Sequence, residues 1–326
     1  MPDTNFRHVL SLGLLCLAGL ISLIVALSVG SVSVSLTELW AVISGRGEGL
    51  HQALVFELRA PRAMAAFATG GLLSLSGALM QVLLRNPLAD PYVLGISGGA
   101  AAGALLSMLL GLGTVMVSGS AFAGALLSTL MVFGLARGRG SWTPTRLLLT
   151  GVVVAAGWGA MITFMLTMGS VEQLPGMLYW LMGDLSYART PWLAWLVLIP
   201  AVLVILPLGR SLNVLARGPL QAAALGVAVK PLAWTVYALA SLLAAVAVTT
   251  AGSVGFVGLI VPHMLRLVLG NDQRIVLPAS VLAGGVLLTV ADTLARTLMA
   301  PEQLPVGVIT ALIGVPTFLF LLYRSR

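Results

Sequence analysis

The chain has 326 residues, of which 59% are hydrophobic and only 8% are charged, and its formal net charge is +7. A soluble domain typically carries about 25% charged residues, so this chain cannot cover a water-facing surface but suits a lipid-facing one. The composition excludes a soluble globular protein and predicts an all-α, polytopic membrane protein. Cys16 is the only cysteine, which excludes an intramolecular disulfide and a cysteine-rich metal site.

The first apolar run, residues 9–29, resembles a secretory signal at first sight. It is longer than the 7–15 residues typical of a signal-peptide core and long enough to cross a bilayer. We therefore interpret it as a retained first span.

Windows of roughly 20 apolar residues predict ten spans in all. The eighth is short and rich in glycine, so we expect it to be tilted or broken. The predicted spans are residues 9–29, 62–84, 93–111, 116–136, 146–168, 191–208, 231–250, 254–269, 279–299 and 306–323.

The distribution of charge orients these spans. With both termini in the cytoplasm, the basic residues fall mostly on the cytoplasmic side, as the positive-inside rule requires. That side holds Arg7, Arg85, Arg137, Arg139, Arg146, Arg210, Arg217, Lys230, Arg266, Arg274, Arg324 and Arg326, and the outer side holds Arg46, Arg59, Arg62, Arg189 and Arg296. Most of the acidic residues, Glu48 among them, also lie on the outer side of the membrane in this orientation. Because the basic residues are spread over short loops, nothing indicates nucleic-acid binding.

The stretch "FELRAPRAMAAFATGG" opens the second span with two cations. Pro61 fits the first position of a helix, which places Arg62 in the first turn. A helix N-terminus already carries partial positive charge, so Arg59 and Arg62 need a further explanation.

Two interpretations of these arginines stay open, and both include Arg296 at the outer end of the ninth span. In the first, the arginines anchor the chain at the membrane interface, with Glu57 and Asp292 as neighbours. In the second, they form an outer cationic patch that receives acidic residues of a partner.

The loop after the second span reads "LLRNPLADPYVLGISGGAAAGALL". Residues before proline are pushed out of helical geometry, so Asn86-Pro87 and Asp90-Pro91 predict a turn before the chain re-enters. For the small residues that follow we expect close helix packing; they are Gly98, Gly99 and Gly103.

The loop after the sixth span, "GRSLNVLARGPLQAAALGVAVKP", is long and only mildly apolar. It predicts a short helix, Leu220 to Leu225, closed by Gly226. Such a helix either lies on the lipid surface or seats in a cytoplasmic partner.

These stretches, with "GSVGFVGLIVPHMLRLVLGNDQRIVLPAS", "ADTLAR" and "LPVGVITALIGVPTFLFLL", resemble the iron-chelate and cobalamin permeases of ATP-binding-cassette importers, the FecCD or BtuC-like family. The resemblance implies a type II importer permease fold in a single domain, residues 1–326. It also implies a homodimer or close heterodimer in the bacterial inner membrane, two cytoplasmic ATPase subunits and a periplasmic binding protein.

The resemblance further assigns roles to residues. Docking of the binding protein would fall on Arg59, Arg62 and Arg296. The cytoplasmic gate would fall on Asn86, Leu88, Pro144 and Thr145. The ATPase-coupling segment, about 212–227, would include Leu212, Arg217, Gly218, Pro219, Leu220, Leu225 and Gly226. One departure stands out, because this chain has Pro219 where the family usually has an acid; a proline at the first helical position is acceptable, so we expect the helix to form.

The sequence contains no GxxxxGK[ST] loop, so ATP hydrolysis must reside on a separate subunit. We predict a transport permease, not an enzyme, with no cofactor and no metal site. The substrate implied by the family is a bulky chelate, a ferric siderophore or cobalamin, with haem behind them. The alternative class is a secondary transporter driven by an ion gradient, which would need intramembrane relays; Asp292 is the only acid plausibly inside a span.

Overall fold

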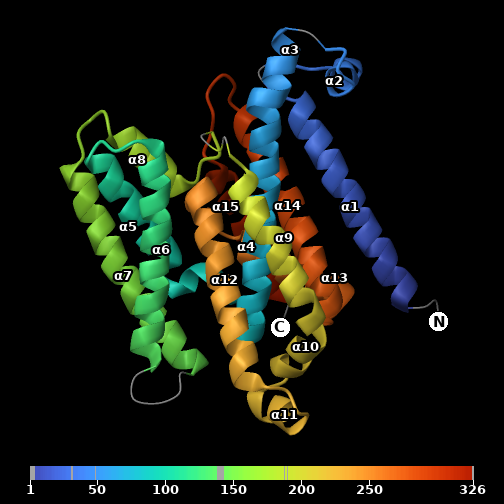
Figure 1. Cartoon of the computed structure of the whole chain (residues 1–326), viewed down its shortest axis with the longest axis vertical. Coiled ribbons are helices and arrows are strands. Elements are labelled where there is room, and N and C mark those ends of the chain that lie inside the picture. The colour runs from blue at the N-terminus through green and yellow to red at the C-terminus, as the bar shows by residue number, and fades with distance from the viewer. Residues whose placement is uncertain are drawn as a thin grey trace.

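The computed structural model describes residues 4–30, 32–47, 49–137, 143–186, 188 and 190–324. Within these ranges the chain folds into helices and loops, with no strand (Figure 1). Four charges used to orient the spans, Glu48, Arg139, Arg189 and Arg326, lie outside the described residues. The elements in chain order are α1 (Thr4–Ser28), α2 (Leu36–Ile43), α3 (Leu50–Ala53), η1 (Leu54–Arg59), α4 (Ala60–Leu84), η2 (Pro91–Leu94), α5 (Ile96–Leu109), α6 (Thr114–Arg137), α7 (Pro144–Met168), α8 (Leu174–Met182), α9 (Trp192–Ile205), η3 (Leu206–Leu208), α10 (Gly209–Ala216), α11 (Pro219–Ala224), α12 (Val229–Ala251), α13 (Val257–Leu269), α14 (Gln273–Thr297) and α15 (Val306–Arg324).

Each of the ten predicted spans corresponds to one apolar helix. Among the described residues, 7 helices are long and apolar enough to cross a membrane, and α5, α13 and α15 are shorter apolar helices. The sequence placed the start of the ninth span at residue 279, whereas α14 begins at Gln273 and contains Pro278. The Asp272 side chain caps this helix by accepting from the backbone N–H of Arg274, so the helix starts before its proline.

Helix α4 is the centre of the main bundle. Every side chain from Ala65 to Leu84 is buried, and α14, α12, α13 and α9 surround the helix. Lipid is as apolar as leucine, so close packing, not exclusion from water, holds such helices together. Accordingly, α4 carries glycines where neighbouring backbones touch it: a Cβ on Gly70 would collide with the carbonyl of Gly284, and one on Gly77 with that of Gly258.

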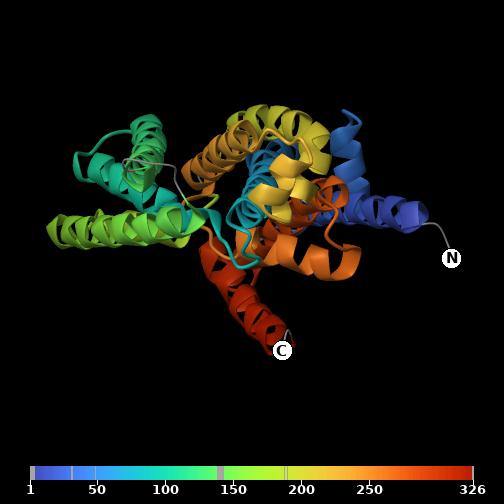
Figure 2. The same ribbon diagram turned by 90° about the horizontal axis from the view of Figure 1, so that it is seen from below.

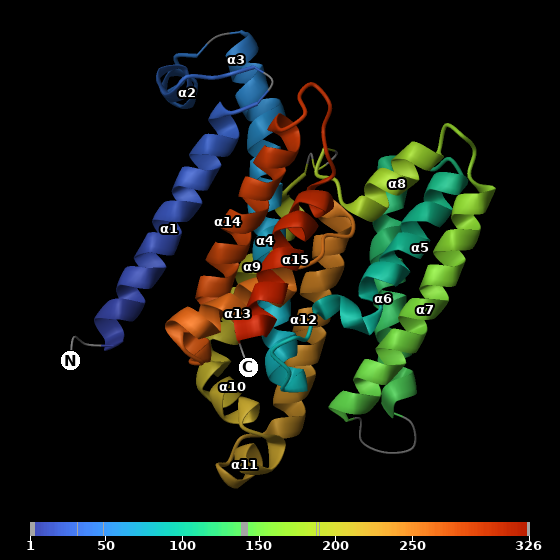
Figure 3. The same cartoon turned by 180° about the vertical axis from the view of Figure 1, so that it is seen from behind.

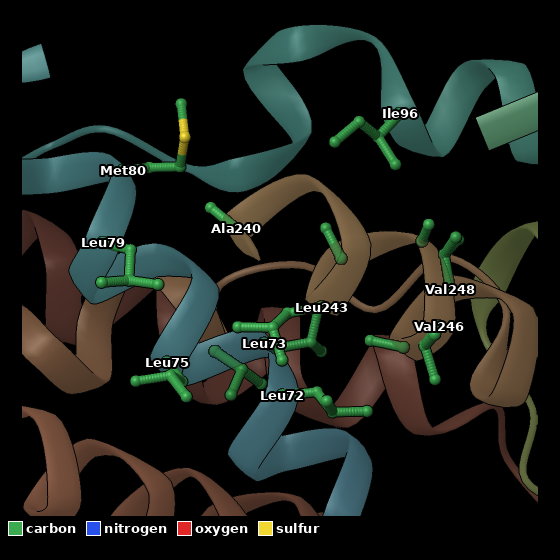
Figure 4. Packing of buried hydrophobic residues seen from close by; sticks show 14 of the residues in the cluster. Leu72, Leu73, Leu75, Leu79, Met80, Ile96, Ala240, Leu243, Val246 and Val248 are labelled. Atoms are coloured by element: carbon green, nitrogen blue, oxygen red, sulfur yellow. The ribbon is translucent and has the colours of Figure 1, made fainter. Parts of the chain in front are cut away.

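Leucine and valine side chains fill the space between these contacts. Figure 4 shows Leu72, Leu73 and Leu79 of α4 with Leu243 and Val246 of α12, and all five are buried.

Helices α5 to α8 form a second group at one side of the main bundle (Figures 1 and 3). Close contact between α5 and α6 depends on glycine, since a Cβ on Gly99 would strike the Gly124 carbonyl and one on Gly103 the Ser120 carbonyl. The Ser107 and Ser120 hydroxyls also meet across this pair, 2.6 Å apart. The predicted packing role of these glycines is confirmed.

The bundle has two ends, the α3 end and the α11 end, each marked by short helices. Helices α2 and α3 lie at the α3 end, and α10 and α11 lie at the α11 end (Figure 1). Helix α1 begins, and α15 finishes, toward the α11 end (Figures 1 and 3).

The second span does not begin at Pro61. Helices α3, η1 and α4 form one continuous helix, Leu50–Leu84, so Arg62 lies inside a helix and not in its first turn. Proline inside an α-helix normally clashes with the preceding turn. Here η1 is a π-helical segment, and the Ala60 N–H donates to Val55 O, five residues back, which widens the helix just before the proline.

Helices α2, α8 and α10 are among the short helices that were not predicted. Helix α2 begins with a capping box, in which the Ser35 and Glu38 side chains and backbones bond reciprocally, a pattern visible in the sequence as S-x-x-E. Helix α8 has no comparable side-chain cap at its start. The predicted short helix in the sixth-to-seventh connection is confirmed as α11, with Pro219 as its first residue and Gly226 at φ +79° after its end.

Candidate functional site

Arg59, Arg62 and Arg296 come together at the α3 end, and Arg59 ties η1 to α1. Its guanidinium donates to the carbonyls of Leu27, at 2.7 Å, and Ser28, at 3.0 Å, and also to Val32 O. The first two are carbonyls of the last turn of α1, where a cation satisfies unpaired acceptors and the helix dipole. Gly30 allows this approach, because a Cβ there would lie 2.7 Å from an Arg59 nitrogen. Arg59 is only 6% exposed.

Arg62 pairs with Asp292 of α14. Its Nη2 lies 2.9 Å from Asp292 Oδ1 and its Nε lies 3.1 Å from Asp292 Oδ2, the bidentate geometry that favours arginine for carboxylates. Its Nη1 donates to Gln303 Oε1 at 2.8 Å. The Asp292 side chain is 2% exposed and that of Arg62 is 12% exposed, so this ion pair lies just beneath the surface.

Arg296 completes the group from the next turn of α14. Its Nε lies 3.2 Å from Asp292 Oδ2, although the direction of the N–H does not make this a hydrogen bond. Its Nη2 donates to Ala26 O at 3.2 Å, so Arg59 and Arg296 both hold the last turn of α1.

We call Arg59, Arg62 and Arg296 around Asp292 the arginine cluster. It contains three guanidinium groups and one carboxylate, and the described residues supply no second ion-pair partner. Glu57, which the sequence suggested as a neighbour, is exposed and forms no ion pair with these arginines. Uncompensated charge beneath a surface is costly, so the cluster favours the arrival of an anion.

The coupling segment is a helix–turn–helix at the α11 end (Figure 2). Leu212 of α10 is buried. The turn at Arg217 and Gly218 places Gly218 at φ +128°, a region that favours glycine. Leu220 is 87% exposed and Leu225 is 69% exposed, so this short segment presents apolar side chains away from the bundle.

Asn213 anchors the coupling segment to the start of α14. Its Nδ2 donates to Asp272 Oδ1 at 2.8 Å, and its Oδ1 accepts from the Gln273 N–H at 2.7 Å. Hydrogen bonds from the Arg274 side chain hold the pKa of Asp272 well below its usual range, and the bond from Asn213 acts in the same direction. The sequence did not single out Asn213 or Asp272, because their contact joins residues far apart in the chain.

The two predicted gate segments lie at the α11 end on different elements (Figure 2). Asn86 Oδ1 accepts from the Leu88 N–H at 2.9 Å, which forms a tight turn after α4, and Leu88 is exposed. Helix α7 begins at Pro144, and Thr145 is exposed. Within the described residues no hydrogen bond joins the two segments.

A bundle of ten apolar helices with charged groups at its two ends defines a polytopic membrane permease. The chain belongs to the FecCD transport family, whose model matches residues 16–324. It is accordingly the permease of an ATP-binding-cassette importer of the FecCD and BtuC type and not an enzyme, which confirms the resemblance found in the sequence.

Three relatives illustrate the similarity. The chain is 37% identical over 325 residues to the vitamin B12 import system permease protein BtuC of Shigella boydii, covering 99% of this chain and 96% of that protein. It is 43% identical over 280 residues to the cobalamin import system permease protein BtuC of Halobacterium salinarum, covering 84% and 74%. It is 35% identical over 323 residues to the ABC transporter permease protein YvrB of Bacillus subtilis, covering 94% and 91%.

Solved structures agree with the fold. A structure described as "An inward-facing conformation of a putative metal-chelate type ABC transporter" superposes with a TM-score of 0.85 at 29% identity, covering 96% of this chain and 98% of that one. A second, PsaBC from Streptococcus pneumoniae in complex with Fab, has a TM-score of 0.52 at 19% identity and shows the fold alone.

Proposed function

We propose that this permease imports a bulky metal chelate, with cobalamin as the first candidate and ferric siderophores as the second. The observation that carries the proposal is the near full-length similarity to permeases named for vitamin B12 import. Ferric siderophores stay in the proposal because the well-matched structure is described by the broader class of metal chelates. The secondary-transporter alternative has no support in the family assignment.

The working unit in this proposal is a homodimer, or a heterodimer with a close paralogue, in the bacterial inner membrane. Each chain is one permease domain, and the dimer carries two cytoplasmic ATPase subunits and a periplasmic binding protein. The α11 end faces the cytoplasm in this arrangement. Two observations support the orientation: most arginines fall at that end, and α1 begins and α15 finishes toward it.

Docking of the binding protein is assigned to the arginine cluster. Arg62 and Arg296 share one carboxylate there, and Arg59 adds a third cation without an ion-pair partner among the described residues, so acidic residues on each lobe of the binding protein would supply the missing negative charge. Arg62 is the contact residue in this scheme, since its side chain is the most exposed of the three. Arg59 and Arg296 hold α1 and position the cluster.

The remaining roles fall at the α11 end. The coupling segment, residues 212–227, would seat in the ATPase through the exposed Leu220 and Leu225. The gate would consist of Asn86 and Leu88 after α4 and of Pro144 and Thr145 at the start of α7. In a single chain these two segments belong to separate helices and do not close a constriction. In this proposal, the corresponding segments of the second subunit complete it.

Uptake into proteoliposomes tests the substrate. The permease would be co-purified with the ATPase and binding protein of its importer, and accumulation of radiolabelled cobalamin, a ferric siderophore and haem would be measured with ATP and with ADP. We expect saturable, ATP-dependent uptake of cobalamin that unlabelled cobalamin suppresses. Siderophore uptake alone would change the substrate but keep the chelate class. If a complex with active ATPase moved none of the three, the proposed function would be wrong.

A reporter fusion tests the orientation independently. A reporter that is active only in the cytoplasm should work when fused after Arg326. Activity of a periplasm-specific reporter at that position would reverse the assignment of both ends.

A further inference from the structure

A cavity of about 610 Å³ lies at the α11 end, among the ends of α4, α10, α13 and α14. We call it the α11 cavity. Its lining includes Asn86 of the gate turn and Ala216 and Arg217 of the coupling segment. Figure 2 views the bundle from this end. The cavity therefore separates the two segments to which gating and coupling are assigned.

The lining of the α11 cavity carries an excess of positive charge. Arg85, Arg217 and Arg266 contribute three guanidinium groups, and Asp272 contributes one carboxylate. That carboxylate is already engaged, because Arg274 Nη2 lies 2.6 Å from its Oδ2 and Asn213 Nδ2 lies 2.8 Å from its Oδ1. Within the described residues, none of the three lining arginines forms an ion pair.

The three arginines reach the cavity from different directions. Arg266 of α13 is partly buried and donates to Gln81 Oε1 and to Ala78 O, so α4 fixes its position. Arg85 ends α4 in the left-handed conformation, at φ 49°, which few residues other than glycine and asparagine adopt readily. A Cβ on Gly218 would lie 3.7 Å from Arg85 Nη1, so the Arg85 side chain extends from the gate turn to the coupling turn.

The surroundings of the cavity indicate what fills it. Arg85, Ala216 and Arg217 are exposed, and Leu220 and Leu225 stand exposed on the helix that follows. Residues 209–230 contain three cations and no acid. An apolar pair beside unpaired arginines is typical of a protein interface, where arginine is enriched and lysine depleted. A protein that covers the two leucines would also cover the cavity.

We propose that the α11 cavity receives an acidic side chain of the ATPase subunit, bound by Arg217, Arg85 and Arg266. The proposal rests on the proposed coupling role of residues 212–227. A carboxylate in this position would join the coupling turn, through Arg217, to the gate turn, through Arg85. Movement of the ATPase would then act on the gate turn through Arg85, and helix α11 would not be the sole connection.

The first test measures binding of the ATPase subunit to the permease in nanodiscs at low and high salt. Reversal of one lining charge, Arg217→Glu, should weaken binding about tenfold or more at low salt and remove most of its salt dependence. Arg217→Gln should have a smaller effect. Arg210→Glu is the matched control: Arg210 is an exposed cation of α10, the helix that ends just before Arg217, and lies outside the cavity lining. Its reversal should change binding less than twofold.

The second test measures the cavity itself, without the ATPase. In a Cys16→Ser background, Ala216→Cys places a thiol in the lining, and Ala224→Cys places one on exposed α11 outside it. The measured quantity is the rate of reaction with a negatively charged thiosulfonate divided by the rate with a positively charged one. This ratio should be about tenfold higher for the lining thiol than for the control thiol, because clefts lined by one sign of charge concentrate counter-ions. Arg217→Gln should reduce this preference, and added ATPase should block the reaction.

Several results would overturn the proposal. Wild-type binding by Arg217→Glu, or equal losses for Arg217→Glu and Arg210→Glu, would show that the cavity does not recognise the ATPase. Protection of the lining thiol by anionic lipid or inorganic phosphate, with no effect of ATPase, would assign the cavity to those anions instead. These measurements use no chelate, so a failure of cobalamin uptake leaves them unaffected and concerns the proposed function alone.

Discussion

The two ends of α4 gather arginines in different ways. At the α3 end, the arginine cluster contains Asp292, a buried carboxylate of the same chain. Two of its arginines, Arg59 and Arg296, also donate to backbone carbonyls of α1. At the α11 end, the arginines of the α11 cavity border open space, and the one carboxylate in the lining is engaged by Arg274 and Asn213.

This difference separates a structural role from a binding role. The arginine cluster helps to hold α1 against the bundle before any partner arrives, and it offers a partner only its surplus charge. Arg217 of the α11 cavity makes no ion pair within the described chain, so its charge remains available to a partner. Changes in the arginine cluster should therefore affect folding first and binding second, whereas changes of Arg217 should affect binding alone.

The largest effect is expected for the removal of Asp292. Asp292→Asn leaves Arg62 and Arg296 without their shared carboxylate, and breaking a buried ion pair by removing one partner costs about 3–5 kcal/mol. We expect a large fall in the thermal unfolding temperature of the permease in detergent, with α1 loosened first.

The matched change in the cavity is Arg217→Gln, which removes a cation that has no ion-pair partner in the described chain. Its effect on unfolding should stay within about 0.5 kcal/mol, as for most surface substitutions. Similar losses for both variants would erase the distinction between the two ends.

A smaller effect is expected for binding-protein docking. Arg62→Gln removes the most exposed cation of the arginine cluster but keeps a polar side chain beside Asp292 and Gln303. Well-placed interfacial charge pairs couple by about 1.5 kcal/mol or more, so association with the binding protein at low salt should weaken about tenfold. Arg46→Glu is the control, since Arg46 is exposed at the same end outside the cluster. If Arg62→Gln bound as wild type does, the arginines would be membrane-interface anchors only.

Much of the fold could be predicted because apolar length is a local property. Ten apolar runs gave ten helices, and Pro219 began α11 as expected. One error arose where Pro61 was taken as a helix start, because a π-helical segment accommodates this proline. Another arose where the ninth span was started at residue 279, because the Asp272 cap starts α14 at Gln273. The capping box of α2 was present in the sequence and was overlooked.

The site was less accessible to sequence reasoning because its contacts are long-range. The Arg62–Asp292 pair joins residues 230 positions apart, and only the i, i+4 spacing of Asp292 and Arg296 is visible locally. Arg59 contacts backbone carbonyls, which every residue possesses, so no pattern of side chains could identify its partners. The same holds for Asn213 and Asp272.

A modest effect is expected at Asp272, whose bonds to Arg274 and Asn213 join the coupling segment to α14. These bonds favour the carboxylate and hold the pKa of Asp272 below its ordinary value, which is about 3.9. A group whose pKa is lowered by folding stabilises the folded state above its unfolded-state pKa, and this contribution is lost as the pH falls through the folded-state pKa.

Asp272→Asn keeps an oxygen to cap α14 but loses the ion pair with Arg274. Because the Arg274 side chain is 53% exposed, the loss at pH 7 should be about 1 kcal/mol or less. The difference in unfolding temperature between wild type and Asp272→Asn should be present at pH 7 and should shrink as the pH is lowered below about 4. A difference that grew at low pH would mean that the carboxylate is held by other groups, and that the tie between the coupling segment and α14 does not depend on its charge.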